Sequence, residues 1–186
     1  MHKRSGPAKK GELAIYEPVR EVIAGSWARD RGITALIVEI TAQQGRRPTG
    51  GTWTRPDLVG VEVRTFDYVP GKRLEVITFE VKAANAIDVR AVYEALAHRA
   101  AATRSYLILH VPVDEAGRWE ASVARVAEAA RHQGIGVLTV GDPGDYQTWR
   151  QREEAIRVEP EPERLNEFIA TQLSPKTRAL ISRSLR

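Results

Sequence analysis

Cysteine is absent from this 186-residue chain, which excludes disulfides and thiolate metal sites and fits a reducing compartment. The chain also lacks a run of about 18 apolar residues, so no membrane-spanning helix is expected. Its basic N-terminus is not followed by an apolar stretch, so no secretory signal is expected either. These absences predict a cytoplasmic protein with no membrane contact.

Several familiar catalytic motifs are also missing. The sequence contains no Gly-x-Gly-x-x-Gly, no Walker loop, no Gly-x-Ser-x-Gly and no His-Glu-x-x-His. Functions in dinucleotide binding, nucleoside triphosphate hydrolysis, serine hydrolysis and zinc proteolysis therefore have no support. The chemistry has to come from other residues.

Acidic residues are missing from both ends of the chain. Residues 1–10 and 176–186 each carry four basic residues and no acid, whereas residues 11–175 hold 20 basic and 24 acidic residues. We therefore predict a disordered basic arm over 1–11, one domain over 12–173 and a basic C-terminal tail over 174–186. Such tails bind phosphate backbones without reading sequence, and improved solubility is the alternative role.

Lysine is scarce, with 6 lysines against 22 arginines. Within residues 11–175 only Lys72 and Lys82 are lysines, and Lys72 lies in a Pro-Gly turn. Lys82 is thus the only lysine in a predicted regular element of this region. Because arginine and lysine differ in shape and in acidity, a lysine kept here suggests a need for a compact ammonium group.

The spacing of apolar residues predicts an α/β fold with a mixed central sheet flanked by helices. The expected helices cover about 12–28, 88–102, 119–133 and 163–173. The expected strands cover 35–41, 58–66, 74–82, 106–111 and 135–140. The order is α-β-β-β-α-β followed by a C-terminal helix-strand-helix. Pro18 falls inside the first helical window and favours a break or a helix start there.

Two short strings at neighbouring strand ends carry the strongest chemical signal. Pro56-Asp57 precedes one strand, and Glu80-Val81-Lys82 ends the next. Because strand side chains alternate with period 2, Glu80 and Lys82 share one face while Val81 points into the core. Asp57 and Glu80 would then bind a hard cation such as Mg²⁺ or Mn²⁺, with the Val81 carbonyl as a further ligand. Lys82 would stabilise the attacking water or the phosphate charge.

With its flanking elements, this pattern resembles the PD-(D/E)xK, or restriction-endonuclease-like, nucleases over about residues 12–112. The resemblance implies a shared α-β-β-β-α-β core, with Asp57 and Glu80 as metal-binding acids and Lys82 as the catalytic lysine. Many relatives also carry an acid on the first helix that reaches the metal. Candidates for it are Glu12 and Glu21, with Glu17 less favoured because it precedes Pro18.

Other polar residues are candidates for supporting roles. Glu39 lies mid-strand among apolar residues, so it needs a partner or belongs to the site. His98 lies on the helix after the third strand, which borders the active site in relatives, and Tyr93 and Glu94 share that helix. Candidates for nucleic-acid binding are Arg46, Arg47, Trp53, Arg55 and Arg99. His110 fits a core histidine, and Asp142 and Asp145 fit a plain turn.

We therefore expect a metal-dependent nuclease that acts on DNA, with a homodimer or a specificity-giving protein partner as further expectations. Two alternatives remain open. One is a module of the same fold that binds nucleic acid or a protein without cutting. The other is a small-molecule-binding α/β protein in which Glu80 and Lys82 form only a surface ion pair.

Overall fold

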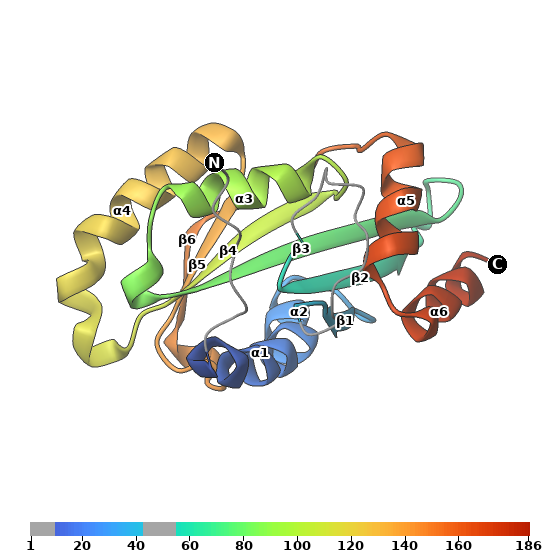
Figure 1. Cartoon of the computed structure of the whole chain (residues 1–186). Coiled ribbons are helices and arrows are strands. Elements are labelled where there is room, and N and C mark those ends of the chain that lie inside the picture. The colour runs from blue at the N-terminus through green and yellow to red at the C-terminus, as the bar shows by residue number, and fades with distance from the viewer. Residues whose placement is uncertain (1–9, 43–54) are drawn as a thin grey trace.

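The computed structural model describes residues 10–42 and 55–186, without the side chains of 10–13, and contains one six-stranded sheet (Figure 1). The strands lie in sequence order and are β1 (Ile37–Ile40), β2 (Leu58–Arg64), β3 (Arg73–Ala83), β4 (Arg104–His110), β5 (Gly136–Val140) and β6 (Trp149–Glu153). Strands β3, β4 and β5 are parallel, and the other neighbours are antiparallel. The predicted α/β class with a mixed sheet flanked by helices is confirmed.

The helices cover both faces of this sheet (Figure 1). They are α1 (Lys10–Val22), a π turn (Ile23–Trp27), α2 (Ala28–Asp30), α3 (Arg90–Arg99), α4 (Ala116–Gln133), α5 (Pro162–Gln172) and α6 (Pro175–Leu185). Short 3₁₀ turns occur at Ala84–Ala86, Val113–Glu115 and Tyr146–Thr148. Within the described residues, no helix is long and apolar enough to cross a membrane.

One face of the sheet packs against α1 and the π turn. Ile77, Phe79 and Val81 alternate along β3 and are buried there, as the period-2 pattern predicts. The Trp27 ring meets Phe79 edge-on, with ring centres 5.5 Å apart. We call this side of the sheet the α1 face.

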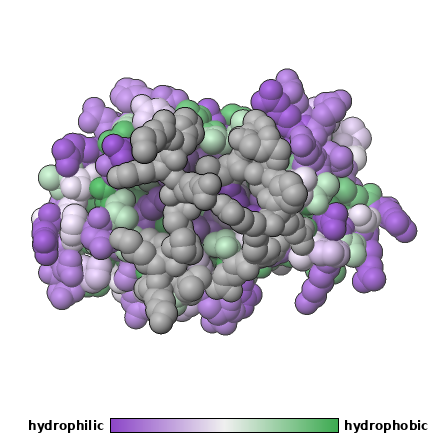
Figure 2. All heavy atoms as spheres, in the orientation of Figure 1, coloured by the Kyte–Doolittle hydropathy of each residue, from purple (hydrophilic) through white to green (hydrophobic). Residues whose placement is uncertain are grey.

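The opposite face divides between two helix pairs. Helices α3 and α4 cover β4 and β5 through a cluster that includes Leu107, Leu109 and Val137. Helices α5 and α6 cover β2 and the start of β3, where Phe168 and Ile181 pack against Val61. Hydrophilic side chains gather over α4 at one end of the molecule and over α5 and α6 at the other (Figure 2). We call this side of the sheet the α3 face.

Pro18 does not break the first helix. Residues 10–30 are helical throughout, although Pro18 lies inside α1. The backbone widens into a π turn five residues later, at Ile23–Trp27. Tight packing outweighs the local cost of proline here, since Tyr16, Val19 and Ile23 on either side of it are almost fully buried.

Two C-terminal elements differ from the predictions. Strand β6 was missed because its sequence, Trp-Arg-Gln-Arg-Glu, is polar and lies at the sheet edge beside β5. Residues 174–186 are not a free tail, because α6 begins at the Ser174 cap and buries Thr177 and Ile181. This segment is an amphipathic helix, although its basic side chains had indicated an exposed tail. Most of the predicted 1–11 arm lies outside the described residues, and helix α1 begins at its Lys10.

Candidate active site

The strand register brings Asp57 and Glu80 together. Leu58 pairs with Phe79 in antiparallel β2 and β3, so Asp57 stands opposite Glu80 just before β2 begins. The Asp57 amide donates to the Phe79 carbonyl at 3.1 Å, and the Thr41 amide donates to the Asp57 carbonyl at 2.9 Å. Asp57 is therefore fixed between β1 and β3 by its backbone.

The Asp57 carboxylate is held by donors from two elements. Strand β3 continues past the start of β2, and there the Val81 amide donates to Asp57 Oδ2 at 2.8 Å. On the other side of the carboxylate, the buried Tyr16 hydroxyl of α1 donates to Asp57 Oδ1 at 2.9 Å. These donors fix the orientation of the carboxylate at the point where β2 and β3 separate.

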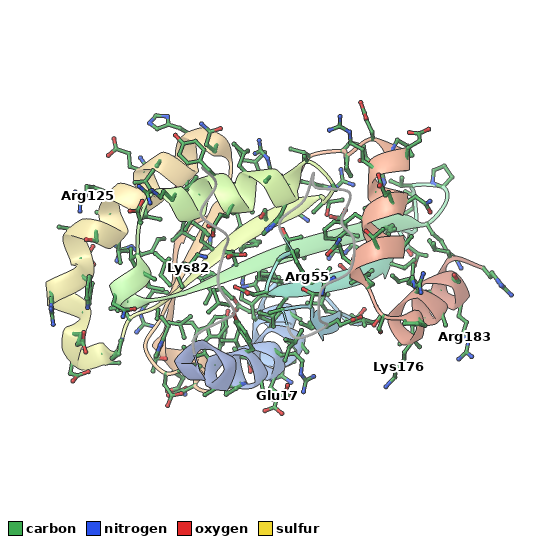
Figure 3. All side chains as sticks on the ribbon, in the orientation of Figure 1. Glu17, Arg55, Lys82, Arg125, Lys176 and Arg183 are labelled. Carbon is green, nitrogen blue, oxygen red and sulfur yellow. The ribbon has the colours of Figure 1, made fainter. Side chains whose placement is uncertain are left out.

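Lys82 lies on the α3 face beneath α3 (Figure 3). Glu80 shares this face, because it precedes Lys82 by two residues in β3. Lys82 Nζ donates to Glu80 Oε1 at 2.7 Å and contacts Glu94 Oε2 of α3 at 2.6 Å. One turn further along α3, His98 Nδ1 lies 4.0 Å from Glu80 Oε2, and His98 is almost fully buried. The expected contribution of α3 to this region therefore comes from Glu94 and His98. Tyr93, by contrast, is 62% exposed.

Burial and like charge act together on Glu80. Burial raises the pKa of Glu80 most, the Asp57 carboxylate raises it further, and Lys82 offsets part of the rise. Burial by itself would lower the pKa of Lys82, but the carboxylates of Glu80 and Glu94 outweigh this effect and raise it. Lys82 is thus an ammonium at neutral pH. Two carboxylates forced together in this way are relieved by a cation that both can contact.

The residues fit a hydrated Mg²⁺ or Mn²⁺ better than a fully caged metal. Within 10–42 and 55–186, no three His, Asp or Glu side chains form a metal-binding group. Mg²⁺ needs only one or two carboxylates, because it retains several waters and binds substrate phosphate oxygens. Glu80 Oε2 is buried and accepts no hydrogen bond from any described residue, so a lone pair is available. The Val81 carbonyl points to the same edge of β3 as its amide, toward Asp57.

No acid of the first helix reaches Asp57 among the side chains described. Glu17 and Glu21 are exposed and pair with Arg20, and Glu17 points away from the sheet (Figure 3). The Glu12 side chain lies outside the described residues. The first helix instead contributes Tyr16, which was not among the candidate site residues predicted from the sequence. A hydroxyl at the end of a buried ring was the signal, because buried tyrosine needs a polar partner.

Two other candidates have structural partners elsewhere. Glu39 accepts from the Ser174 amide at 2.9 Å and from the Ser174 hydroxyl, so it holds the start of α6, and its supporting role in the site stays a prediction. Arg99 donates to the Gln133 carbonyl at the end of α4, and its expected nucleic-acid role stays a prediction.

The remaining candidates divide between partly buried positions and residues outside the described part of the chain. Arg55 Nε donates to the buried Gln172 side chain at 3.1 Å. Arg46, Arg47 and Trp53 lie outside the described residues. His110 is half-buried, and burial lowers its pKa.

The 141–145 segment is a turn, as expected. Asp142 Oδ1 accepts from the Gly144 amide at 2.8 Å, and Asp145 Oδ1 accepts from the Gln147 amide at 3.0 Å. Both carboxylates thus bond to their own loop, which is typical of aspartate in a turn.

A comparison with protein-family models found no match, and a comparison with curated proteins found no significant relative. The function therefore has to be argued from the site. The site offers two carboxylates that repel each other, those of Asp57 and Glu80, and the adjacent ammonium of Lys82. Glu80 Oε2 accepts no hydrogen bond from any described residue. Together these groups can bind a divalent cation beside a phosphate and stabilise negative charge there.

Proposed function

We propose that this protein is a metal-dependent nuclease of the restriction-endonuclease-like fold that hydrolyses phosphodiester bonds in DNA. One observation carries the proposal: Asp57 stands opposite Glu80, and Lys82 Nζ lies 2.7 Å from Glu80 Oε1. The element order α-β-β-β-α-β of residues 10–110 supports it, since this is the order of the superfamily that the motif resembles.

Each site residue has a distinct role in this proposal. Asp57, oriented by Val81 and Tyr16, and Glu80, with its free Oε2, are the carboxylates that would hold Mg²⁺ or Mn²⁺. The bound metal would supply Lewis-acid stabilisation and lower the pKa of a coordinated water. Lys82 assists the attacking water by stabilising the negative charge that develops there and on the phosphate.

Glu94 keeps Lys82 in place. Its carboxylate contacts Lys82 Nζ at 2.6 Å from the α3 side, while Glu80 contacts the same nitrogen from β3. If Glu80 held a metal, its contact with Lys82 would weaken, and Glu94 would still hold the ammonium beside the phosphate position. Glu94 is therefore a positioning residue for Lys82.

Contacts with the DNA backbone are proposed for the basic C-terminal helix. Lys176 and Arg183 extend from α6 away from the sheet (Figure 3). No acidic residue occurs in 175–185. Such contacts carry no sequence information, so a protein partner would supply specificity. Cutting both strands of a duplex needs two sites, which a homodimer would provide.

A second candidate function is a module that binds nucleic acid without cutting it. The observation in its favour is that Lys82 is engaged by two carboxylates at once. In that case the ion-paired cluster would serve only to stabilise the junction of β2, β3 and α3. The two candidates differ in whether DNA is cleaved.

Cleavage of supercoiled plasmid and of single-stranded DNA, with Mn²⁺, Mg²⁺ or EDTA, tests the proposal. The proteins are wild type, Lys82→Ala and Lys72→Ala, where Lys72 is the other lysine of residues 11–175 and lies in the exposed β2–β3 turn. We expect metal-dependent cleavage by wild type and Lys72→Ala, and a rate lower by about a hundredfold or more in Lys82→Ala.

Three other outcomes would each remove part of the proposal. DNA binding in a gel shift without cleavage would favour the non-cutting module. The absence of both DNA binding and DNA cleavage would favour the small-molecule-binding alternative. Equal cleavage by wild type and Lys82→Ala would remove Lys82 from the mechanism but leave the carboxylates in it.

A further inference from the structure

A cavity of about 350 Å³ lies between α5, α6 and the start of β3, apart from the candidate active site. Its walls are largely apolar and include Leu74, Leu165, Ile169, Ile181 and Leu185. The volume falls at the lower end of the range for small-molecule sites. Figure 2 shows hydrophobic residues among hydrophilic ones at this end of the molecule.

The cavity contains one cationic side chain, that of Arg178. Its Nη1 donates to the Ala170 carbonyl at 3.2 Å, but its Nε is buried and makes no hydrogen bond to any described residue. No carboxylate of the described residues pairs with Arg178, and no acidic residue lines the cavity. A guanidinium that lines an apolar cavity without a carboxylate partner favours an anionic ligand.

We propose that this cavity binds a small monocarboxylic acid with an apolar chain. The carboxylate pairs with the Arg178 guanidinium, and the chain packs against the walls formed by α5 and α6. A single negative charge matches the single guanidinium, whereas a doubly charged phosphate would bury an unpaired charge among apolar walls. Asn166 and Ser182 also line the cavity and offer further hydrogen-bonding groups.

A small molecule fits the cavity better than a protein partner does. Among the exposed large hydrophobic side chains of the described residues, only Leu185 lines the cavity. Leu74, Leu165 and Ile169 are partly buried and Ile181 is buried, whereas the smaller Pro162 and Ala170 are exposed. Most of the large apolar side chains are thus recessed. A stable protein interface instead buries about 800 Å² on each partner, over a broader surface.

The test is a calorimetric titration of the full chain with octanoate, and in parallel with octanol. Octanol has the same chain length but no charge, so the pair isolates the contribution of Arg178. We expect saturable octanoate binding that is about tenfold or more tighter than octanol binding. The titrations contain EDTA and no DNA, so their outcome does not depend on the proposed nuclease activity.

Variants locate the binding site. Arg178→Met keeps a long side chain and should reduce octanoate affinity to that of octanol, whereas Arg183→Met, exposed on the same helix and outside the cavity, should bind octanoate like wild type. Ser182→Leu should weaken both ligands by filling the cavity. If Arg178→Met fails to fold, the octanoate–octanol difference in wild type and the effect of Ser182→Leu still decide.

Three results would overturn the proposal. Equal affinity of wild type for octanoate and octanol would show that the cavity does not select for a carboxylate. Such an apolar surface would instead suit a hydrophobic side chain of a protein partner. Absence of saturable binding by either ligand, or binding that Ser182→Leu does not weaken, would exclude the cavity as the ligand site.

Discussion

Asp57 shows how one side chain can depend on donors from two distant parts of the sequence. Tyr16 lies 41 residues before it and Val81 lies 24 residues after it, yet both donate to its carboxylate. Removing the Tyr16 hydroxyl leaves the ring in the core but takes away one donor to the carboxylate. This makes Tyr16→Phe a clean test of positioning.

We expect Tyr16→Phe to lower the Mn²⁺ affinity by about tenfold, because groups that orient metal ligands typically contribute tenfold to a hundredfold. The stability loss should be about 1 kcal/mol. Mn²⁺ titration followed by calorimetry measures the affinity. The control is Tyr146→Phe, since the Tyr146 hydroxyl also donates to a carboxylate, Asp30, at 2.9 Å but outside the site. Equal effects of the two variants would show that Tyr16 has no special role.

Glu80 gives the protein a pH-dependent stability with a definite sign. Its pKa is raised in the folded state, chiefly by burial, so the charged form is disfavoured relative to the unfolded chain. The stability that this group contributes is fully present below its unfolded pKa of about 4.3 and is lost as pH rises through its folded pKa.

In EDTA at neutral pH, we therefore expect the melting temperature of Glu80→Gln to be about 2–4 °C higher than that of wild type. This is the shift that a change of about 1 kcal/mol in the free energy of unfolding gives a chain of this size. The difference should shrink at pH 4, where Glu80 of wild type is protonated. Thermal unfolding across pH 4–8 measures this, with the exposed Glu128→Gln of α4 as control. A lower melting temperature for Glu80→Gln at neutral pH would mean that the Lys82 pairing outweighs the burial of charge.

Gly136 is required by close packing and not by backbone conformation. A Cβ at this position would lie 2.2 Å from Cδ1 of the Tyr106 ring, which is itself buried against Trp27. We expect Gly136→Ala to lower the free energy of unfolding by about 1–3 kcal/mol, measured by urea denaturation. Gly117→Ala is the control, because nothing lies within 4 Å of its added Cβ in α4, and it should be neutral or slightly stabilising.

At the scale of elements, a carboxylate of β1 joins the sheet edge to the C-terminal helix. Glu39 accepts from the Ser174 amide and hydroxyl, while Ser174 Oγ accepts from the Thr177 amide as the N-cap of α6. The neighbouring Gln172 accepts from Arg55, two residues before Asp57. The turn between α5 and α6 is therefore attached to two segments that lead into the site.

We expect Ser174→Ala to cost about 1 kcal/mol, through the lost cap and the lost hydroxyl contact with Glu39. The effect should be local, so hydrogen exchange should accelerate in the α6 amides and remain unchanged in α4. Ser122→Ala, which removes a hydroxyl from α4 instead, serves as control. Uniform acceleration across the chain would contradict a local capping role.

At the scale of the whole molecule, the folding energy holds two carboxylates together that would otherwise repel each other. A cation that binds the folded but not the unfolded chain therefore raises the melting temperature. At a concentration of Mn²⁺ about 100 times its dissociation constant, the gain is about 2.7 kcal/mol. For a chain of this size that corresponds to roughly 5–10 °C.

We expect this Mn²⁺-dependent rise in wild type and in Asp67→Asn, and its loss in Asp57→Asn. Asp67 is exposed in the β2–β3 turn, so the control removes the same charge away from the site. Differential scanning calorimetry with and without EDTA measures the effect. An equal rise in all three proteins would place the Mn²⁺ site elsewhere.

The sequence by itself determined the fold class and most of the elements. Alternating apolar residues in β2 and β3, helical spacing in α3 and α4, and Gly134 after α4 are local signals, so they need no tertiary information. The same period-2 rule placed Glu80 and Lys82 on one face and Val81 in the core, as the structure has them. These patterns were sufficient to find the residues at the centre of the candidate site.

Tertiary structure decided what those residues contact. The polar strand β6 forms because β5 offers an open edge, and the basic α6 folds because Ile181 packs onto β2 and β3 while Glu39 holds its start. The partnership of Tyr16 with Asp57 depends on how α1 crosses the sheet, which no local pattern encodes. Contacts between distant segments are set by packing, so the sequence located the carboxylates while only the folded chain determined which groups orient them.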